Sequence, residues 1–158
     1  MSTVIGIDPG QQCGLAVFSH GMLTNVLTLA PHELMKWLRE FVNEVHGMGE
    51  MADGLPFVVF EDSRLQSHVW NATGKRGSLR IARNLGMVDG ICAQLQGWCE
   101  GEDVDYIAVS PKGKGRKMDT AAFKFLTGWA KRTNQHERDA ALVAWPYRST
   151  KPARRAGQ

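Results

Sequence analysis

Four ionisable residues stand where the ends of predicted strands and of one predicted helix would meet: Asp8, Glu61, His136 and Asp139. The first two end short apolar runs of strand type, Val4–Ile7 and Phe57–Phe60. The other two are three residues apart and share a helix face, and the small alanines beside them allow that face to approach a sheet. Because sites in α/β sheets form at strand ends, these four side chains are predicted to converge.

Carboxylates and an imidazole that converge without a base among them repel one another unless a cation fills the space. A site dominated by oxygen ligands suits Mg²⁺ or Mn²⁺, whereas Zn²⁺ would require more cysteine and histidine. Two such ions about 3.5–4 Å apart can activate a water and stabilise the leaving oxygen of a phosphodiester. The residue types therefore predict a divalent-metal site that supports phosphodiester hydrolysis.

Each of these residues also has a structural explanation when it is taken alone. Asp8 precedes Pro-Gly, which is typical of a turn residue that caps its own backbone. Glu61 could be a solvated strand end, and the adjacent Asp62 competes with it for the site. His136 could be a polar residue of a helix N-terminus, and Glu137 could be only part of the cap. The combination, rather than any single residue, favours the metal site.

Basic residues gather in stretches that contain no acid. Residues 63–88 hold five arginines and lysines, residues 112–117 hold four in one loop, and no acid follows Asp139. One basic run is usually a solvated face, but three of them in a chain of 158 residues indicate a polyanionic partner, most commonly nucleic acid. The candidate DNA contacts are Arg64, Trp70, Lys75, Arg76, Arg80, Lys112, Lys114, Arg116 and Lys117.

Apolar periodicity and turn residues predict the order β-β-β-α-β-α-β-α-α. The predicted strands are Val4–Ile7, Cys13–Phe18, Met22–Thr28, Phe57–Phe60 and Tyr106–Val109. The predicted helices are Pro31–Val45, Ser78–Trp98, Thr120–Ala130 and Gln135–Trp145. This order predicts an α/β fold, a five-stranded mixed sheet with helices on both faces. One domain of residues 1–147 is expected, followed by a basic, disordered tail of residues 148–158.

The composition of the chain indicates the cellular compartment in which the protein is expected. No apolar run is long enough to span a bilayer, and the first residues lack the features of a signal peptide. Three scattered cysteines, Cys13, Cys92 and Cys99, have no metal-ligand spacing and are interpreted as thiols of the core. We therefore expect a cytoplasmic protein in a reducing environment, with no membrane partner.

One family opens with a sequence similar to Ile5-Gly6-Ile7-Asp8-Pro9-Gly10 and Gly14-Leu15-Ala16-Val17: the RuvC-type Holliday-junction resolvases, members of the RNase H-like nuclease superfamily. The resemblance continues in the order of later features, namely a strand ending in Glu61, the helical run Ala82–Gly90, Pro111-Lys112 after a strand, and a last helix with His136 and Asp139-Ala140-Ala141. It covers residues 4–145. The opening motif is shared with other RNase H-like proteins, so the ordered set is the more specific feature.

The resemblance implies an RNase H-like fold and places the family's metal-binding acids on Asp8, Glu61 and Asp139. The fourth ligand position, three residues before the last acid, is aspartate in some members and histidine in others, and here it is His136. A neutral imidazole is a competent ligand and removes one negative charge from the cluster. The family's phosphate-contacting lysines lie in the loop that here contains Lys112, Lys114 and Lys117.

The implied function is a structure-selective endodeoxyribonuclease that uses Mg²⁺ or Mn²⁺, with two ions per site, to leave 5′-phosphate nicks in four-way junctions and other branched DNA. The resemblance implies a homodimer, for which the helix Ser78–Trp98 with its glycines is the expected face. The basic loop after Glu61 is longer than in bacterial members, which suits a phage-type member and leaves the strictness for junctions open. In that loop Trp70 is a candidate for stacking on an unpaired base.

Other functions stay open at this stage. An RNase H-like nuclease that acts on a flap or an RNA/DNA hybrid would carry the same motifs. A non-catalytic nucleic-acid-binding protein with a decayed metal site would not need to keep all four ligand residues. An ATPase of the actin-like superfamily also opens with a strand, an aspartate and glycines, but it needs a larger, two-lobed chain than 158 residues.

Overall fold

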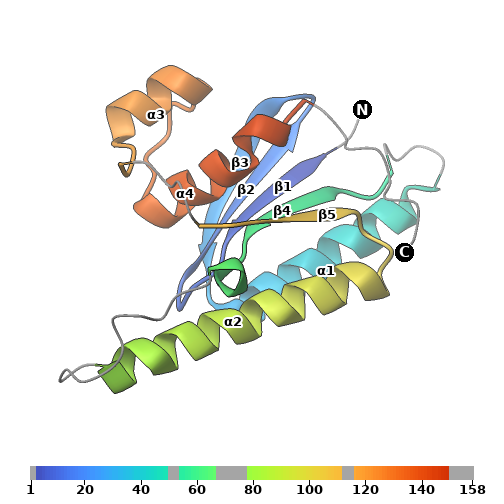
Figure 1. Ribbon diagram of the computed structural model, residues 1–158. Coiled ribbons are helices and arrows are strands. Elements are labelled where there is room, and N and C mark those ends of the chain that lie inside the picture. The colour runs from blue at the N-terminus through green and yellow to red at the C-terminus, as the bar shows by residue number, and fades with distance from the viewer. Residues whose placement is uncertain (1–2, 50–53, 67–77, 112–115, 150–158) are drawn as a thin grey trace.

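A five-stranded mixed sheet forms the centre of the molecule in the computed structural model, which describes residues 3–49, 54–66, 78–111 and 116–149 (Figure 1). The strands are β1 (Val4–Asp8), β2 (Cys13–Ser19), β3 (Met22–Leu29), β4 (Phe57–Glu61) and β5 (Tyr106–Val109). Their order across the sheet is β3-β2-β1-β4-β5. The first three pair antiparallel, whereas β4 is parallel to β1 and β5 to β4. The predicted meander and all five predicted strands are confirmed.

Helices cover both faces of this sheet, as the sequence predicts. Helices α1 (Pro31–Gly47) and α2 (Ser78–Gly101) lie on one face, and α3 (Thr120–Thr127) and α4 (Gln135–Ala144) lie on the other (Figure 1). Two short 3₁₀ helices, η2 (Ser63–Leu65) and η3 (Trp145–Tyr147), follow β4 and α4. The α/β fold with a five-stranded mixed sheet is therefore present as predicted.

Strand alternation divides the core into two layers, because successive side chains of a strand point to opposite faces. Ile5, Ile7, Val58 and Phe60 belong to the layer that packs against α1 and α2. The intervening positions of the same strands, including Val4 and Val59, belong to the layer that contains the alanines of α4. The face on which a residue lies therefore follows from its parity along the strand.

Helix ends follow local capping chemistry. At the start of α4, the Asn134 side chain accepts a bond from the Glu137 backbone, and the Glu137 side chain accepts one from the Asn134 backbone, which confirms the predicted capping box. The helix predicted to run from Thr120 to Ala130 ends earlier, at Thr127. Gly128 stops it by taking a left-handed conformation with φ of 72°.

Helix α2 is buried over only part of its length. Ile91, Cys92, Leu95 and Cys99 pack into the core, whereas Leu79 and Ile81 are 74% and 49% exposed. The first half of the helix extends beyond the sheet (Figure 1), so the apolar side chains at its start are exposed.

The three cysteines are free thiols buried in the core, as expected. Burial raises the pKa of Cys99 to about 12, so this thiol stays protonated at neutral pH. No helix in the described part of the chain is long and apolar enough to cross a membrane.

Helix α4 lies directly on the backbone of β1 and β2 because both strands have a glycine beneath it. A Cβ atom at Gly6 would overlap the Ala140 carbonyl oxygen and lie 2.7 Å from the Ala144 Cβ. A Cβ atom at Gly14 would overlap the His136 carbonyl oxygen. Because real side chains do not tolerate such overlaps with backbone atoms, only glycine permits this approach of helix to sheet.

Replacing Gly14 with alanine is therefore expected to push α4 away from the sheet. We predict that Gly14→Ala lowers the free energy of unfolding by about 3 kcal/mol, at the upper end of ordinary overpacking, because the obstacle is backbone. Denaturant unfolding measures the change. Gly97→Ala is the matched control, since a Cβ there meets nothing within 4 Å and alanine favours a helix by roughly 0.5–1 kcal/mol. Equal stability of Gly14→Ala and the wild type would contradict the close docking of α4.

Candidate active site

Asp8 and Glu61 lie side by side at the same edge and on the same face of the sheet. The last β1–β4 pair is Ile7 with Phe60, so the next residues of the two parallel strands, Asp8 and Glu61, are neighbours in register. By parity both share the face of Val4 and Val59, the face covered by α4. Two carboxylates thus end adjacent strands beneath the N-terminal end of α4.

Helix α4 brings the other two predicted residues to this edge. Its first turn lies over Gly14, which pairs directly with Asp8 across β1 and β2. The His136 Nδ1 atom lies 3.7 Å from the Asp8 Oδ2 atom, and their side chains are 48% and 15% exposed. Asp139, one turn along the same face, is buried, with its side chain 6% exposed. The ends of β1 and β4 and the first turn of α4 thus lie at the same edge of the sheet.

Two side chains contact the Asp139 carboxylate from different directions. Gln135 Nε2 donates a hydrogen bond of 2.7 Å to Oδ1. Lys117 Nζ lies 3.7 Å from Oδ2, and the lysine side chain is 70% exposed. Sequence reasoning identified Lys117 only as a DNA contact and did not identify Gln135. The i, i+4 spacing of Gln135 and Asp139 could have indicated this hydrogen bond, because residues four apart on a helix are neighbours.

The donor types at this edge fit a hard divalent cation, since three carboxylates and one imidazole offer oxygen and nitrogen ligands. Within the described ranges, however, no three His, Cys, Asp or Glu side chains lie close enough together to hold a metal ion. Binding of a cation at this edge would therefore require a third side chain to move toward Asp8 and His136. The residues that could hold it are Asp8, Glu61, His136 and Asp139.

The two alternative acids have structural roles. Asp62 follows Glu61 and points to the opposite face, where it is 2% exposed and binds the Arg64 guanidinium at 2.7 Å. The hydrogen bond from Arg64 holds the pKa of Asp62 below its ordinary value. Asp62, which competes with Glu61 for the site in the sequence, is thus buried on the other face with its own counter-ion. Glu137 is engaged in the cap of α4 and accepts a bond from Thr28.

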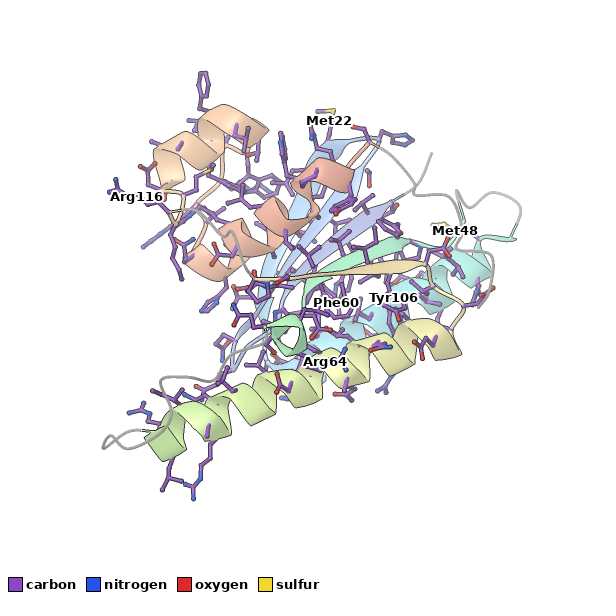
Figure 2. The ribbon with its side chains drawn as sticks, viewed as in Figure 1. Met22, Met48, Phe60, Arg64, Tyr106 and Arg116 are labelled. Atoms are coloured by element: carbon purple, nitrogen blue, oxygen red, sulfur yellow. The ribbon has the colours of Figure 1, made fainter. Side chains whose placement is uncertain are left out.

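The predicted DNA contacts divide into three groups. Arg64 is committed to Asp62 and to Gln96, so its guanidinium supports the fold on the α2 side of the sheet (Figure 2). Arg80, Arg116 and Lys117 are exposed, and Arg116 lies on the opposite side, near α3 and α4 (Figure 2). The remaining candidates lie outside the described residues: Trp70, Lys75, Arg76, Lys112 and Lys114.

A groove of about 920 Å³ lies away from this edge, along β5 and the second half of α2. Its described walls include Arg64, Gln96, Glu100 and Tyr106, and none of the four predicted ligands. A chain of hydrogen bonds runs along it from Arg64 through Gln96 to Glu100, which also accepts a bond from Tyr106. This network joins α2 to the edge strand, and the groove is separate from the acidic strand ends.

The order of strands, the mixed pairing and the helices on both faces define an RNase H-like fold. Among solved structures, the chain is similar to T. thermophilus RuvC in complex with a Holliday junction substrate. The TM-score is 0.55 and the sequence identity 18%, and the similarity covers 92% of this chain and 91% of that chain. At this identity the similarity establishes the fold. No protein-family model and no curated protein sequence matches the chain.

The structural role of Asp62 has a pH signature. Because its folded-state pKa is lowered, the ion pair with Arg64 stabilises the fold above the unfolded-state pKa, near 3.9, and this stabilisation is lost as the pH falls through the folded-state value. Asp62→Asn is predicted to lower the free energy of unfolding by about 1–3 kcal/mol at pH 7. The difference from wild type should shrink toward zero in strongly acidic solution, as denaturant unfolding at several pH values would measure.

A fully stable Asp62→Asn protein at pH 7 would contradict the structural role of this carboxylate.

Proposed function

We propose that this protein is a metal-dependent, structure-selective endonuclease that resolves Holliday junctions and other branched DNA and leaves 5′-phosphate nicks. The observation that carries the proposal is the placement of Asp8 and Glu61 in neighbouring strand ends directly beneath His136 and Asp139 of α4. Support comes also from the RNase H-like fold and from its similarity to a RuvC that was solved with a Holliday junction.

In this proposal Asp8, Glu61, His136 and Asp139 hold Mg²⁺ or Mn²⁺, two ions per site. When bound, the ions supply a nucleophilic water and stabilise the leaving oxygen of the scissile phosphodiester. The carboxylates provide the negative charge that selects a divalent cation, and the imidazole keeps that charge from becoming excessive. The burial of Asp139 limits its hydration, which strengthens its attraction for a cation.

DNA is proposed to approach from the α4 side, where exposed basic residues adjoin the acidic strand ends. Lys117 is 70% exposed and lies next to Asp139, so its ammonium group can reach a phosphate held at the site. Arg116 beside it and Arg80 on α2 are also exposed. The proposed surface is completed by the residues outside the described ranges: Trp70, Lys75, Arg76, Lys112 and Lys114.

A homodimer is the proposed active form, because two nicks on opposite strands need two sites. The first half of α2 extends beyond the sheet and exposes Leu79, Ile81 and Met87, which supports it as the dimer face. Gly86 and Gly90 on the same stretch have open space around them, so a second helix could approach closely there.

Cleavage of a substrate panel tests the proposal. The panel contains a four-way junction, a flap, an RNA/DNA hybrid and a plain duplex, each incubated with Mg²⁺ or Mn²⁺ and with EDTA. We predict preferred cleavage of the four-way junction with 5′-phosphate ends and no cleavage in EDTA. Preference for the flap or the hybrid would support a different RNase H-like nuclease, and binding without any cleavage would support a non-catalytic DNA-binding protein.

Asp8→Asn separates catalysis from binding. We predict that this variant loses metal-dependent cleavage by at least about 10³-fold, since it removes a charge from the reacting centre, while its affinity for a four-way junction changes little. Asn keeps the size of the side chain, so thermal unfolding should stay close to that of the wild type. Loss of junction binding in a folded Asp8→Asn protein would contradict a purely catalytic role.

The lysines near the site are expected to bind phosphates. Changing Lys112, Lys114 and Lys117 together to glutamine should weaken junction binding and lower the slope of log affinity against log salt by about one per lost contact. Fluorescence anisotropy at several salt concentrations measures both effects. Lys36→Gln is the control, because this lysine pairs with Glu40 on α1, on the other face of the sheet. An unchanged slope in the triple variant would contradict the assignment of the loop.

A further inference from the structure

Arg138 ties α4 to the chain on both sides of α3. Its guanidinium donates to the Met118 carbonyl oxygen at 3.0 Å and to the Thr133 carbonyl oxygen at 2.9 Å. It also reaches the hydroxyl oxygens of Thr120 and Thr133 at 3.3 and 3.2 Å. A fifth bond, from Nη2 to Gln135 Oε1 at 3.0 Å, remains within α4. All three nitrogens of the planar group thus donate to neighbouring polar atoms.

The bond from Arg138 determines which way the Gln135 amide points. A guanidinium only donates hydrogen bonds, so the atom of Gln135 that it contacts must be the carbonyl oxygen. The amide nitrogen then faces Asp139 Oδ1, to which it donates at 2.7 Å. Arg138 therefore donates a hydrogen bond to Gln135, and Gln135 donates one to Asp139.

Lys117, which lies near the second oxygen of Asp139, belongs to a segment that the same guanidinium holds. Lys117, which lies 3.7 Å from Oδ2, directly precedes Met118, whose carbonyl oxygen is held by Arg138. Gln135 thus occupies Oδ1 while the backbone next to Lys117 is tied to α4. The direct hydrogen bond from Gln135 and the burial of the carboxylate, whose side chain is 6% exposed, restrict its orientation.

We propose that Gln135 and Arg138 are positioning residues for Asp139: they hold its carboxylate in one orientation for binding a divalent cation together with Asp8 and His136. The inference rests on the proposed function, because it assigns these residues to the same metal site. By the same network, Arg138 couples the orientation of Asp139 to the segment that carries Lys117, which is proposed to bind phosphate. Outer partners of this kind typically contribute 10–100-fold to metal affinity.

Titration of the DNA-free protein with Mn²⁺ tests the inference without relying on cleavage. Gln135→Met keeps the length of the side chain but removes the amide, and we expect it to weaken Mn²⁺ binding about 10-fold with a melting temperature close to that of the wild type in EDTA. Gln94→Met is the matched control, since Gln94 is an exposed glutamine of α2, and its Mn²⁺ affinity should equal that of the wild type. Calorimetry gives the affinities.

Arg138→Lys supplies a second, independent measurement. Lysine keeps the positive charge but cannot hold Gln135, Met118 and Thr133 together, so both the Mn²⁺ affinity and the melting temperature should fall. If Arg138→Lys lowers only the melting temperature, Arg138 serves merely to attach α3, and its positioning role is overturned.

The outcomes separate this inference from the proposed function. Wild-type protein that binds no Mn²⁺ would overturn both. Wild-type protein that binds Mn²⁺, with equal affinity in Gln135→Met, would overturn the positioning role and leave the metal site standing. A Gln135→Met protein that does not fold would be replaced by Gln135→Asn, which keeps the amide but shortens its reach, and the same loss of affinity is expected.

Discussion

A helix can lie with its carbonyl groups against a sheet only where the strands beneath it have no Cβ atoms. Gly6 and Gly14 satisfy this condition in neighbouring strands, and the carbonyl oxygens of Ala140 and His136 occupy the space that side chains would otherwise fill. The position of α4, and with it the distance from His136 to Asp8, follows from this contact. The glycines of the opening motif therefore act at the candidate site through backbone packing.

Two adjacent acids at the end of β4 show how parity along a strand divides function. Glu61 lies on the α4 face beside Asp8, whereas Asp62 lies on the α2 face, buried and paired with Arg64. A buried carboxylate is tolerated there because a charged donor satisfies it. The α4 face carries the four candidate ligands, whereas on the α2 face the Asp62 carboxylate binds Arg64 of η2, which in turn contacts Gln96 of α2.

The similarity to RuvC at 18% identity shows how little of a sequence a fold requires. Cores accept many apolar substitutions when volume and pattern are kept, so the two apolar layers can persist while individual residues change. Positions where backbone meets backbone, such as Gly14 under His136, have no such freedom. The hydrogen bonds around Asp139 depend on particular side chains, since the Gln135 amide accepts from Arg138 through its oxygen and donates to the carboxylate through its nitrogen.

The sequence by itself determined the strands, most helix boundaries, the capping box at Asn134 and Glu137, and the four candidate ligands, because periodicity and caps are encoded within a few residues. Only the tertiary structure showed that Asp62 is buried on the face opposite to Glu61, paired Arg64 with Asp62 and joined Arg138 to Met118 and Thr133. Those outcomes depend on contacts between residues far apart in the chain, whose meeting is set by strand register and by the docking of α4, and no local pattern records them.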